Sequence, residues 1–292
     1  MWSNVRAMSA GDQLVEVNGA ELCVESFGDA ADPAILLVAG ASASMLWWDA
    51  ELCERIAAAG RFVIRYDARD TGRSVSYPPG QPGYSLADLV QDALGILDTV
   101  GVERAHFVCQ SMFGGLGLVV AVDHPDRMAT LTLVSTSTGD EQLPPPAEYF
   151  TEHAPPEPDL ADTAAVIDYV VRSMKAISGG SAHFDEAEAR ELVERDVARA
   201  RDYASTLANH YAMVSDKPVN GGFEDITAPT LVVHGDLDPL LPLAHGEALR
   251  DAIPAAELLV LRGAGHDLPR PTWDAFVAGV VRHTESPSPG TR

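Results

Sequence analysis

Short apolar runs alternate with longer amphipathic stretches along most of the chain. The runs AILLVAG (34–40), FVIRYD (62–67) and AHFVCQ (105–110) are rich in apolar residues and typical of strands buried on both faces. Between them, residues 51–60 and 85–101 carry apolar side chains at helical spacing. Strands that alternate with helices predict an α/β fold, a mostly parallel sheet with helices on both faces.

The same pattern predicts elements at both ends of the chain. Asn18-Gly19 separates two short strands and is a strong signal for a hairpin turn. Further strands are expected at 129–135, 230–235 and 257–263, and further helices at 114–124, 243–252 and 271–284. Together the predicted strands make an eight-stranded sheet.

The alternation is interrupted after Ser135. Pro-rich polar segments are followed by two helical patterns, at 161–177 and 185–212. This region is either a lid over the carboxyl ends of the strands, where ligands bind in such sheets, or a second small domain unrelated to the site. The lid is favoured because the alternation resumes at once, without a linker. The predicted organisation is a core (1–139 and 223–285), a helical lid (140–222) and a flexible tail (286–292).

Charge and composition narrow the class of partner. The formal net charge is −23 and the pI about 4.5, so nucleic acid and anionic membranes are not expected as partners. No apolar run reaches the ~18 residues that span a bilayer, and the N-terminal residues contain no apolar leader segment. The three cysteines are far apart and form no disulfide framework. We therefore expect a cytoplasmic protein, a monomer or homodimer, with a small-molecule substrate.

Three groups of reactive residues each follow a predicted strand. Ser111 lies in CQSMFGG, between a strand and a helix; Asp236 and Asp238 follow the strand 230–235; and His266 follows the last strand. This chain order of nucleophile, acid and base is that of the α/β hydrolases. A neutral imidazole can remove the hydroxyl proton, and a carboxylate holds the imidazole in the required tautomer. Amides at the start of the following helix can stabilise an oxyanion.

The chain resembles the α/β-hydrolase family over essentially its whole length. Its first half is most similar to the aclacinomycin methylesterase group, which removes methyl esters from anthracyclines; the matching stretches are DPAILLVAGASASMLWW, FVIRYDARDTGRS, GVERAHFV and AVDHPDR. The resemblance implies that Asp238, directly before Pro239, is the acid, with Asp236 as the alternative. It also implies that the amides of Ala41 and Met112 form the oxyanion hole.

The turn around Ser111 departs from the family pattern G-x-S-x-G, because Cys109 and Phe113 occupy the glycine positions. The helix can begin late, with Gly114 and Gly115 supplying the space; the Phe113 ring can form part of the pocket wall; or the turn is distorted. Cys109 is not expected to be a nucleophile, because a thiol in a buried strand is usually inert.

No metal or cofactor is expected. His106, His124 and His153 show no ligand spacing, and no glycine-rich phosphate loop is present in the right context. In DARDTGRS, the charged residues are interpreted as a network that fixes the loop, with a direct role in substrate binding as the less favoured alternative.

The aromatic residues indicate the kind of substrate. Trp47, Trp48 and Phe113 are expected to line an apolar pocket, although packing in the core is an equal alternative for each Trp. Aromatic and Met side chains of the insertion favour a large, apolar, aromatic small molecule. The first hypothesis is a serine hydrolase that cleaves a polyketide-like methyl ester through an acyl-enzyme. A cofactor-independent lyase, cyclase or decarboxylase, with Ser111 positioning the substrate, is the second, and a catalytically silent binding protein is the third.

Overall fold

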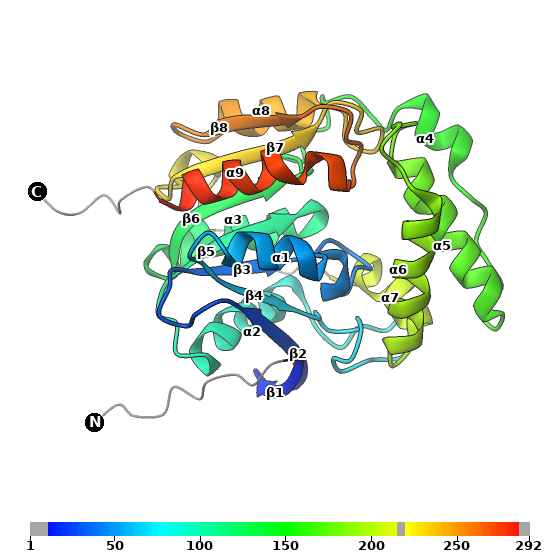
Figure 1. Cartoon of the computed structure of the whole chain (residues 1–292), viewed down its shortest axis with the longest axis horizontal. Coiled ribbons are helices and arrows are strands. Elements are labelled where there is room, and N and C mark those ends of the chain that lie inside the picture. Colours follow the sequence, from blue (N-terminus) through cyan, green and yellow to red (C-terminus); the bar gives the residue numbers. More distant parts are fainter. Residues whose placement is uncertain (1–10, 215–219, 286–292) are drawn as a thin grey trace, which may run out of the picture.

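Eight strands form one sheet in the order β1-β2-β4-β3-β5-β6-β7-β8 in the computed structural model, which describes residues 11–214 and 220–285 (Figure 1). β1 and β2 are antiparallel to their neighbours, and from β4 to β8 all pairs are parallel. The predicted mostly parallel, eight-stranded sheet is confirmed. The strands are β1 (Gln13–Val17), β2 (Ala20–Phe27), β3 (Ala34–Val38), β4 (Phe62–Tyr66), β5 (Ala105–Gln110), β6 (Met128–Val134), β7 (Thr230–Gly235) and β8 (Glu257–Leu261).

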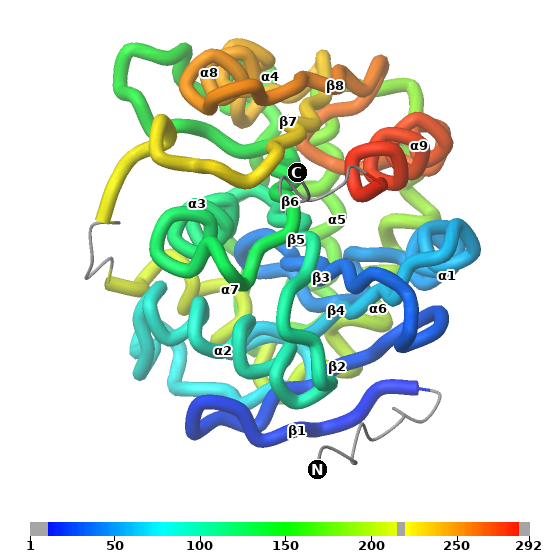
Figure 2. The backbone as a smooth tube through the Cα atoms, turned by 90° about the vertical axis from the view of Figure 1, so that its left-hand side faces the viewer, coloured from blue at the N-terminus to red at the C-terminus, as the bar shows by residue number. Residues whose placement is uncertain are grey.

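Helices cover both faces of the sheet, as Figure 2 shows. One face carries α1 (Ala50–Ala57) and α9 (Trp273–Thr284), and the other carries α2 (Leu86–Thr99), α3 (Gly114–Asp123) and α8 (Ala244–Ala252). Alternate residues of the central strands enter the two apolar layers, because successive side chains of a strand point to opposite faces. In β3, for example, Leu36 packs in one layer and Leu37 in the other.

The first hairpin has the turn that its sequence predicts. Asn18 and Gly19 both have positive φ, 49° and 71°, as a type I′ turn requires. Short 3₁₀ turns complete the connections between the larger elements: Met45–Trp47, Ser111–Phe113, Pro125–Arg127, Phe223–Asp225 and Arg270–Thr272. No helix in the described part of the chain is long and apolar enough to cross a membrane.

Between β6 and β7, the residues that the structure describes form four α-helices, which lie beyond one end of the sheet (Figure 1). The single helical pattern expected at 185–212 is divided into two helices, because Ala200 is extended and the Asp202 carboxylate caps a new helix start. The first, short helix follows the Pro-rich segment and was not predicted. The four helices are α4 (Glu148–His153), α5 (Thr163–Ile177), α6 (Glu186–Arg199) and α7 (Tyr203–Ala212). The tail expected at 286–292 lies outside the described residues.

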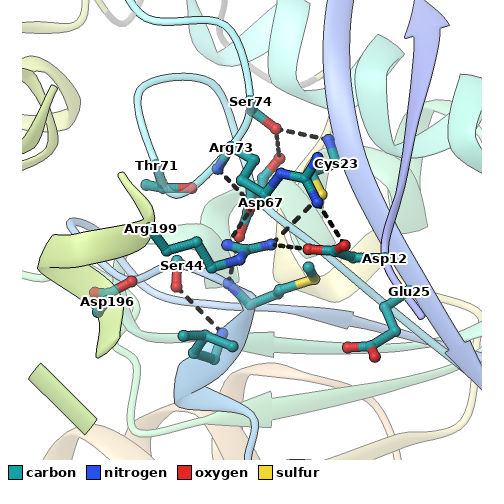
Figure 3. Close-up of polar contacts among 12 residues, drawn as sticks. Asp12, Cys23, Glu25, Ser44, Asp67, Thr71, Arg73, Ser74, Asp196 and Arg199 are labelled. Atoms are coloured by element: carbon teal, nitrogen blue, oxygen red, sulfur yellow. Dashed lines mark hydrogen bonds and ion pairs between the residues drawn. The ribbon is translucent and has the colours of Figure 1, made fainter. Parts of the chain in front are cut away.

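A buried ionic cluster attaches the end of α6 to the core of the fold (Figure 3). The Arg199 guanidinium lies 2.6 Å from the Asp67 carboxylate and 3.1 Å from that of Asp12, which also pairs with Arg73. Asp67 is fully buried and accepts the Met45 amide at 3.0 Å. The inserted helices are thereby tied to the loops that follow β3 and β4.

Candidate active site

Ser111 lies at a sharp turn between β5 and α3. Its φ is +52°, in the left-handed region, and such a conformation in a non-glycine residue is characteristic of strained functional turns. A single 3₁₀ turn, Ser111–Phe113, follows, and α3 begins at Gly114. The chain therefore leaves the sheet abruptly and presents the hydroxyl at the carboxyl end of the central strand.

Two hydrogen bonds connect the three residues predicted to be catalytic. His266 Nε2 is 2.9 Å from Ser111 Oγ, and His266 Nδ1 is 2.8 Å from Asp238 Oδ2. The other carboxylate oxygen of Asp238 accepts the amides of Leu240 and Leu241 at 2.9 and 2.8 Å. An ionised carboxylate only accepts, so Nδ1 carries the imidazole proton and Nε2 is free to accept from the serine. The arrangement allows His266 to act as a general base toward Ser111.

A second histidine stabilises the charge of Asp238. Burial by itself raises the pKa of the Asp238 carboxyl, but His266, His234 and the Leu241 amide outweigh it, and the pKa lies well below its usual value. His234 Nε2 is 3.4 Å from Asp238 Oδ2 and 2.7 Å from the Leu241 carbonyl. His234 was not singled out from the sequence, although its spacing from Asp238 across a tight turn is the signal that could have identified it.

Asp236, the alternative acid, has a different environment. Its carboxylate accepts the Gly263 amide at 2.7 Å and lies 3.2 Å from Arg262, which is mostly exposed. These contacts brace the two turns that follow β7 and β8. Of the two carboxylates, only Asp238 meets the His266 imidazole.

The two residues expected to supply the oxyanion amides, Ala41 and Met112, belong to segments next to Ser111. Ala41 lies in a tight turn that the Ala43 amide closes onto the Gly40 carbonyl at 3.3 Å. This turn packs on the nucleophile, since a Cβ added to Gly40 would lie 3.1 Å from the Ser111 Cβ, and Ala41 and Ser111 border the same cavity. Met112 follows Ser111 directly and its side chain is partly exposed.

Phe113 does not line the cavity, and that expectation is wrong. Its ring is 1% exposed and packs in the core, edge-on to His210 with ring centres 4.9 Å apart. The position that must be small is Gly114, one residue after Phe113. A Cβ on Gly114 would lie only 2.8 Å from Thr136 Cγ2. For a Cβ on Gly115 the nearest atom is Leu86 Cδ2 at 4.0 Å, an ordinary contact. Of the three outcomes considered for the turn, the late start of the helix is the one observed.

A cavity of about 820 Å³ opens above Ser111 and His266. Trp47 borders it and donates its indole N–H to Asp196 at 3.0 Å. Trp48 also borders it, but its side chain is 2% exposed and stacks on Phe276 in the core. Several aromatic and apolar side chains of the insertion, from its helices and from the connection between α5 and α6, complete the walls: Phe150, Tyr169, Met174, Phe184, Tyr203 and Leu207.

The charged residues of DARDTGRS fix the loop after β4. Arg69 forms a bidentate ion pair with Asp92 at 2.7 and 2.8 Å. Asp70 has φ +67°, and its carboxylate accepts from Tyr84 and Asn209 at 2.7 and 2.9 Å. Neither charged residue borders the cavity, in agreement with a structural role.

Other chemistries find little support around Ser111. The Cys109 thiol is fully buried, and burial raises its pKa far above the usual range, so it is a poor nucleophile. Within residues 11–214 and 220–285, no group of three His, Cys, Asp or Glu side chains is arranged to hold a metal ion.

The sequence and fold of the chain were compared with those of known proteins, and the comparison identifies its family. Residues 33–269 match the family model of the alpha/beta hydrolase fold. The chain is 31% identical to the rhodomycin D methylesterases DauP of Streptomyces sp. (strain C5) and DnrP of Streptomyces peucetius, over 94% of this chain and 98% of each relative. A meta-cleavage product hydrolase from Pseudomonas fluorescens IP01 has the same fold, with a TM-score of 0.73 and 20% identity over 94% of this chain and 97% of that one. The chain belongs to the α/β-hydrolase family.

Proposed function

We propose that this protein is a serine carboxylic-ester hydrolase that removes a methyl ester from a large, polycyclic aromatic small molecule. The observation that carries the proposal is the hydrogen-bonded chain Ser111–His266–Asp238 at the base of a cavity of about 820 Å³. The two curated relatives, which are rhodomycin D methylesterases, support both the reaction and the substrate class.

In the proposed reaction, Ser111 Oγ attacks the ester carbonyl while His266 Nε2 takes the hydroxyl proton. The amides of Ala41 and Met112 stabilise the oxyanion of the tetrahedral intermediate. His266 then gives the proton to the leaving oxygen, and methanol departs from the acyl-enzyme. His266 then takes a proton from water, which attacks the acyl carbon, and returns that proton to Ser111 Oγ as the bond to the acyl group breaks; the carboxylic acid is released and the serine is restored.

The aromatic side chains that line the cavity support an aromatic substrate. Trp47 lines it from the α/β core, while Phe150, Tyr169 and Phe184 line it from the inserted segment. Flat aromatic rings can stack on such walls and leave little apolar surface in water. We propose that the predicted insertion, residues 140–222, is the lid that forms the roof of this cavity.

The two alternative functions have weaker support from the structure. The hypothesis of a non-hydrolytic enzyme depended on a distorted turn, and Ser111 Oγ lies within hydrogen-bond distance of the base. The same contact argues against a silent binding protein. Cys23, Cys53 and Cys109 are free and buried, which fits the proposed cytoplasmic location, and a monomer or homodimer remains the proposed state.

The proposal is tested with an anthracyclinone methyl ester as substrate. The wild-type protein should release one methanol for each carboxylic acid formed, and Ser111→Ala should reduce kcat by at least ~10³-fold. Turnover of the ester at an unchanged rate by Ser111→Ala contradicts the mechanism.

A further inference from the structure

The α7 helix presents polar side chains, rather than apolar ones, to the core. Thr206, Asn209 and His210 are each at most 2% exposed. Thr206 Oγ1 donates to the Asp70 carbonyl at 2.6 Å, Asn209 donates to the Asp70 carboxylate at 2.9 Å, and His210 Nε2 lies 2.9 Å from the Arg69 carbonyl. This number of directional contacts holds α7 in a single position against the loop that follows β4.

The hydrogen bonds of His210 fix its tautomer. The Arg69 carbonyl can only accept, so Nε2 carries the proton. Nδ1 then has a free lone pair, and it accepts the Ser42 amide at 3.0 Å. A protonated imidazole would lose this second bond. Burial favours the neutral form, since it lowers the pKa of His210 despite the opposing effects of the Arg69 carbonyl and Asp70.

Ser42 belongs to the turn that contains the proposed oxyanion donor. The Ala43 amide closes this turn onto the Gly40 carbonyl, and Ser42, at its third position, has φ +59°. A positive φ at the third position is characteristic of type II turns and favours glycine there. A serine in this conformation is strained, and relaxation to negative φ would rotate the Ala41–Ser42 peptide. Because the hydrogen bond from Ala43 to Gly40 holds the ends of the turn, this rotation would shift Ala41 and with it the Gly40–Ala41 peptide, which carries the Ala41 N–H.

The unusual residue of the nucleophile turn contacts the same histidine. The Phe113 ring meets the His210 imidazole edge-on, with ring centres 4.9 Å apart, and both side chains are buried. His210 therefore contacts the turn around Ala41 on one side and the residue after Met112 on the other. The two proposed oxyanion amides lie in segments that this one imidazole joins.

We propose that His210 is a positioning residue for ester hydrolysis: by accepting the Ser42 amide, it holds the 40–43 turn in the conformation that directs the Ala41 amide at the oxyanion. The inference rests on the function proposed above and deepens it. It assigns to an inserted helix a role in the chemical step, in addition to its role as a wall of the cavity.

Two substitutions of His210 separate its two hydrogen bonds. In His210→Asn, the amide oxygen takes the place of Nδ1, so the acceptor for Ser42 is kept and the donor to Arg69 is lost. In His210→Gln, the amide nitrogen takes the place of Nε2, so the donor is kept and the acceptor is lost. We expect kcat of His210→Asn to stay within about tenfold of wild type and that of His210→Gln to fall about 10²-fold, as for the loss of one oxyanion donor.

Further measurements distinguish a positioning role of His210 from a contribution to the stability of the fold alone. KM should be the same for both variants, while the inhibition constant of an aryl trifluoromethyl ketone, which forms a tetrahedral adduct with the serine, should rise in parallel with the loss of kcat. Adding Ser42→Gly to His210→Gln should restore at least tenfold of the lost kcat, because glycine adopts the left-handed conformation without help. Equal losses of kcat in the Asn and Gln variants, or no rescue by Ser42→Gly, overturn the proposal.

A measurement on the wild-type protein covers the case in which the variants do not fold. Nitrogen-15 NMR of the histidine-labelled protein should show His210 as the Nε2–H tautomer with an unprotonated Nδ1, and an Nδ1–H tautomer overturns the proposal. Failure of the hydrolase function is recognised separately: in that case wild-type Ser111 forms no covalent adduct with an alkyl fluorophosphonate. A wild-type protein that is labelled, together with a fully active His210→Gln, rejects only the role of His210.

Discussion

Gly114 packs directly against Thr136, the residue that lies two positions after the end of β6. A Cβ on the glycine would lie 2.8 Å from the threonine Cγ2, closer than side chains pack. In the pattern G-x-S-x-G, the small residue stands two positions after the serine. Here it stands three positions after Ser111, and Phe113 occupies the usual place with its ring turned into the core.

Gly114→Ala should therefore damage the turn, whereas Gly115→Ala should not. Both glycines lie at the start of α3, but an added methyl clashes with Thr136 only at position 114. We expect Gly114→Ala to lower the free energy of unfolding by about 1–3 kcal/mol and to reduce kcat, because the clash displaces the segment next to Ser111. Urea unfolding and ester turnover measure the two effects. Equal behaviour of the two variants contradicts this description of the turn.

The two carboxylates of HGDLDP should differ sharply in their effect on catalysis. Asp238→Asn keeps the shape of the side chain but favours the wrong imidazole tautomer of His266, so kcat should fall by about 10⁴-fold with little change in KM. Asp236→Asn weakens only contacts to Gly263 and Arg262 and should keep kcat within about threefold. A greater loss in Asp236→Asn would show that the acid has been assigned to the wrong residue.

Two arginines near the end of α6 should contribute unequally to stability. Arg199 neutralises the fully buried Asp67, whereas Arg201 pairs with Glu21 at the surface. Arg199→Met leaves the Asp67 charge uncompensated and should lower the free energy of unfolding by about 3–5 kcal/mol. Arg201→Met should change it by about 1 kcal/mol or less. Comparable losses in urea unfolding would contradict the importance given to the cluster in Figure 3.

His106 should make the fold sensitive to acid. Burial, with the nearby Arg61, His283 and Arg104, lowers the pKa of His106 to about 4. The ordinary pKa of histidine is about 6.5. Between these two pH values His106 is protonated in the unfolded chain but neutral in the folded one. The free energy of unfolding therefore decreases as the pH falls, and this group contributes up to about 1.4 kcal/mol per pH unit.

The check is the free energy of unfolding at several pH values between 7 and 4.5. His106→Gln should make its fall with pH shallower, and His153→Gln, which changes an exposed histidine, should leave it unchanged. The same slope in wild type and His106→Gln would show that other groups cause the acid sensitivity.

The strands of the sheet and the helices that cover it could be predicted, because each forms from a pattern of apolar and polar residues that lies within its own short segment. Buried parallel strands are continuous apolar runs, and their helices carry apolar stripes, so every strand of the sheet was found. The inserted helices were harder to predict. The start of α7 depends on one capping carboxylate, Asp202, within a continuous helical pattern, and the face that α7 presents to the core is polar.

The reactive residues could be predicted from their order along the chain, but their surroundings could not. Ser111, Asp238 and His266 each follow a strand, and parallel strands bring their carboxyl ends to one edge. The direction of the Phe113 ring, and the contacts of His210 and His234, depend on segments far apart in the sequence. Periodicity carries no information about such contacts.

The central claim is that Ser111 is a nucleophile activated by His266, and covalent labelling tests it most directly. The intact mass of the protein is measured over time after addition of an alkyl fluorophosphonate. We predict one adduct per chain, on Ser111, which is absent in Ser111→Ala and forms at least ~10³-fold more slowly in His266→Ala. A wild-type protein that hydrolyses the methyl ester but never acquires the adduct would contradict the account.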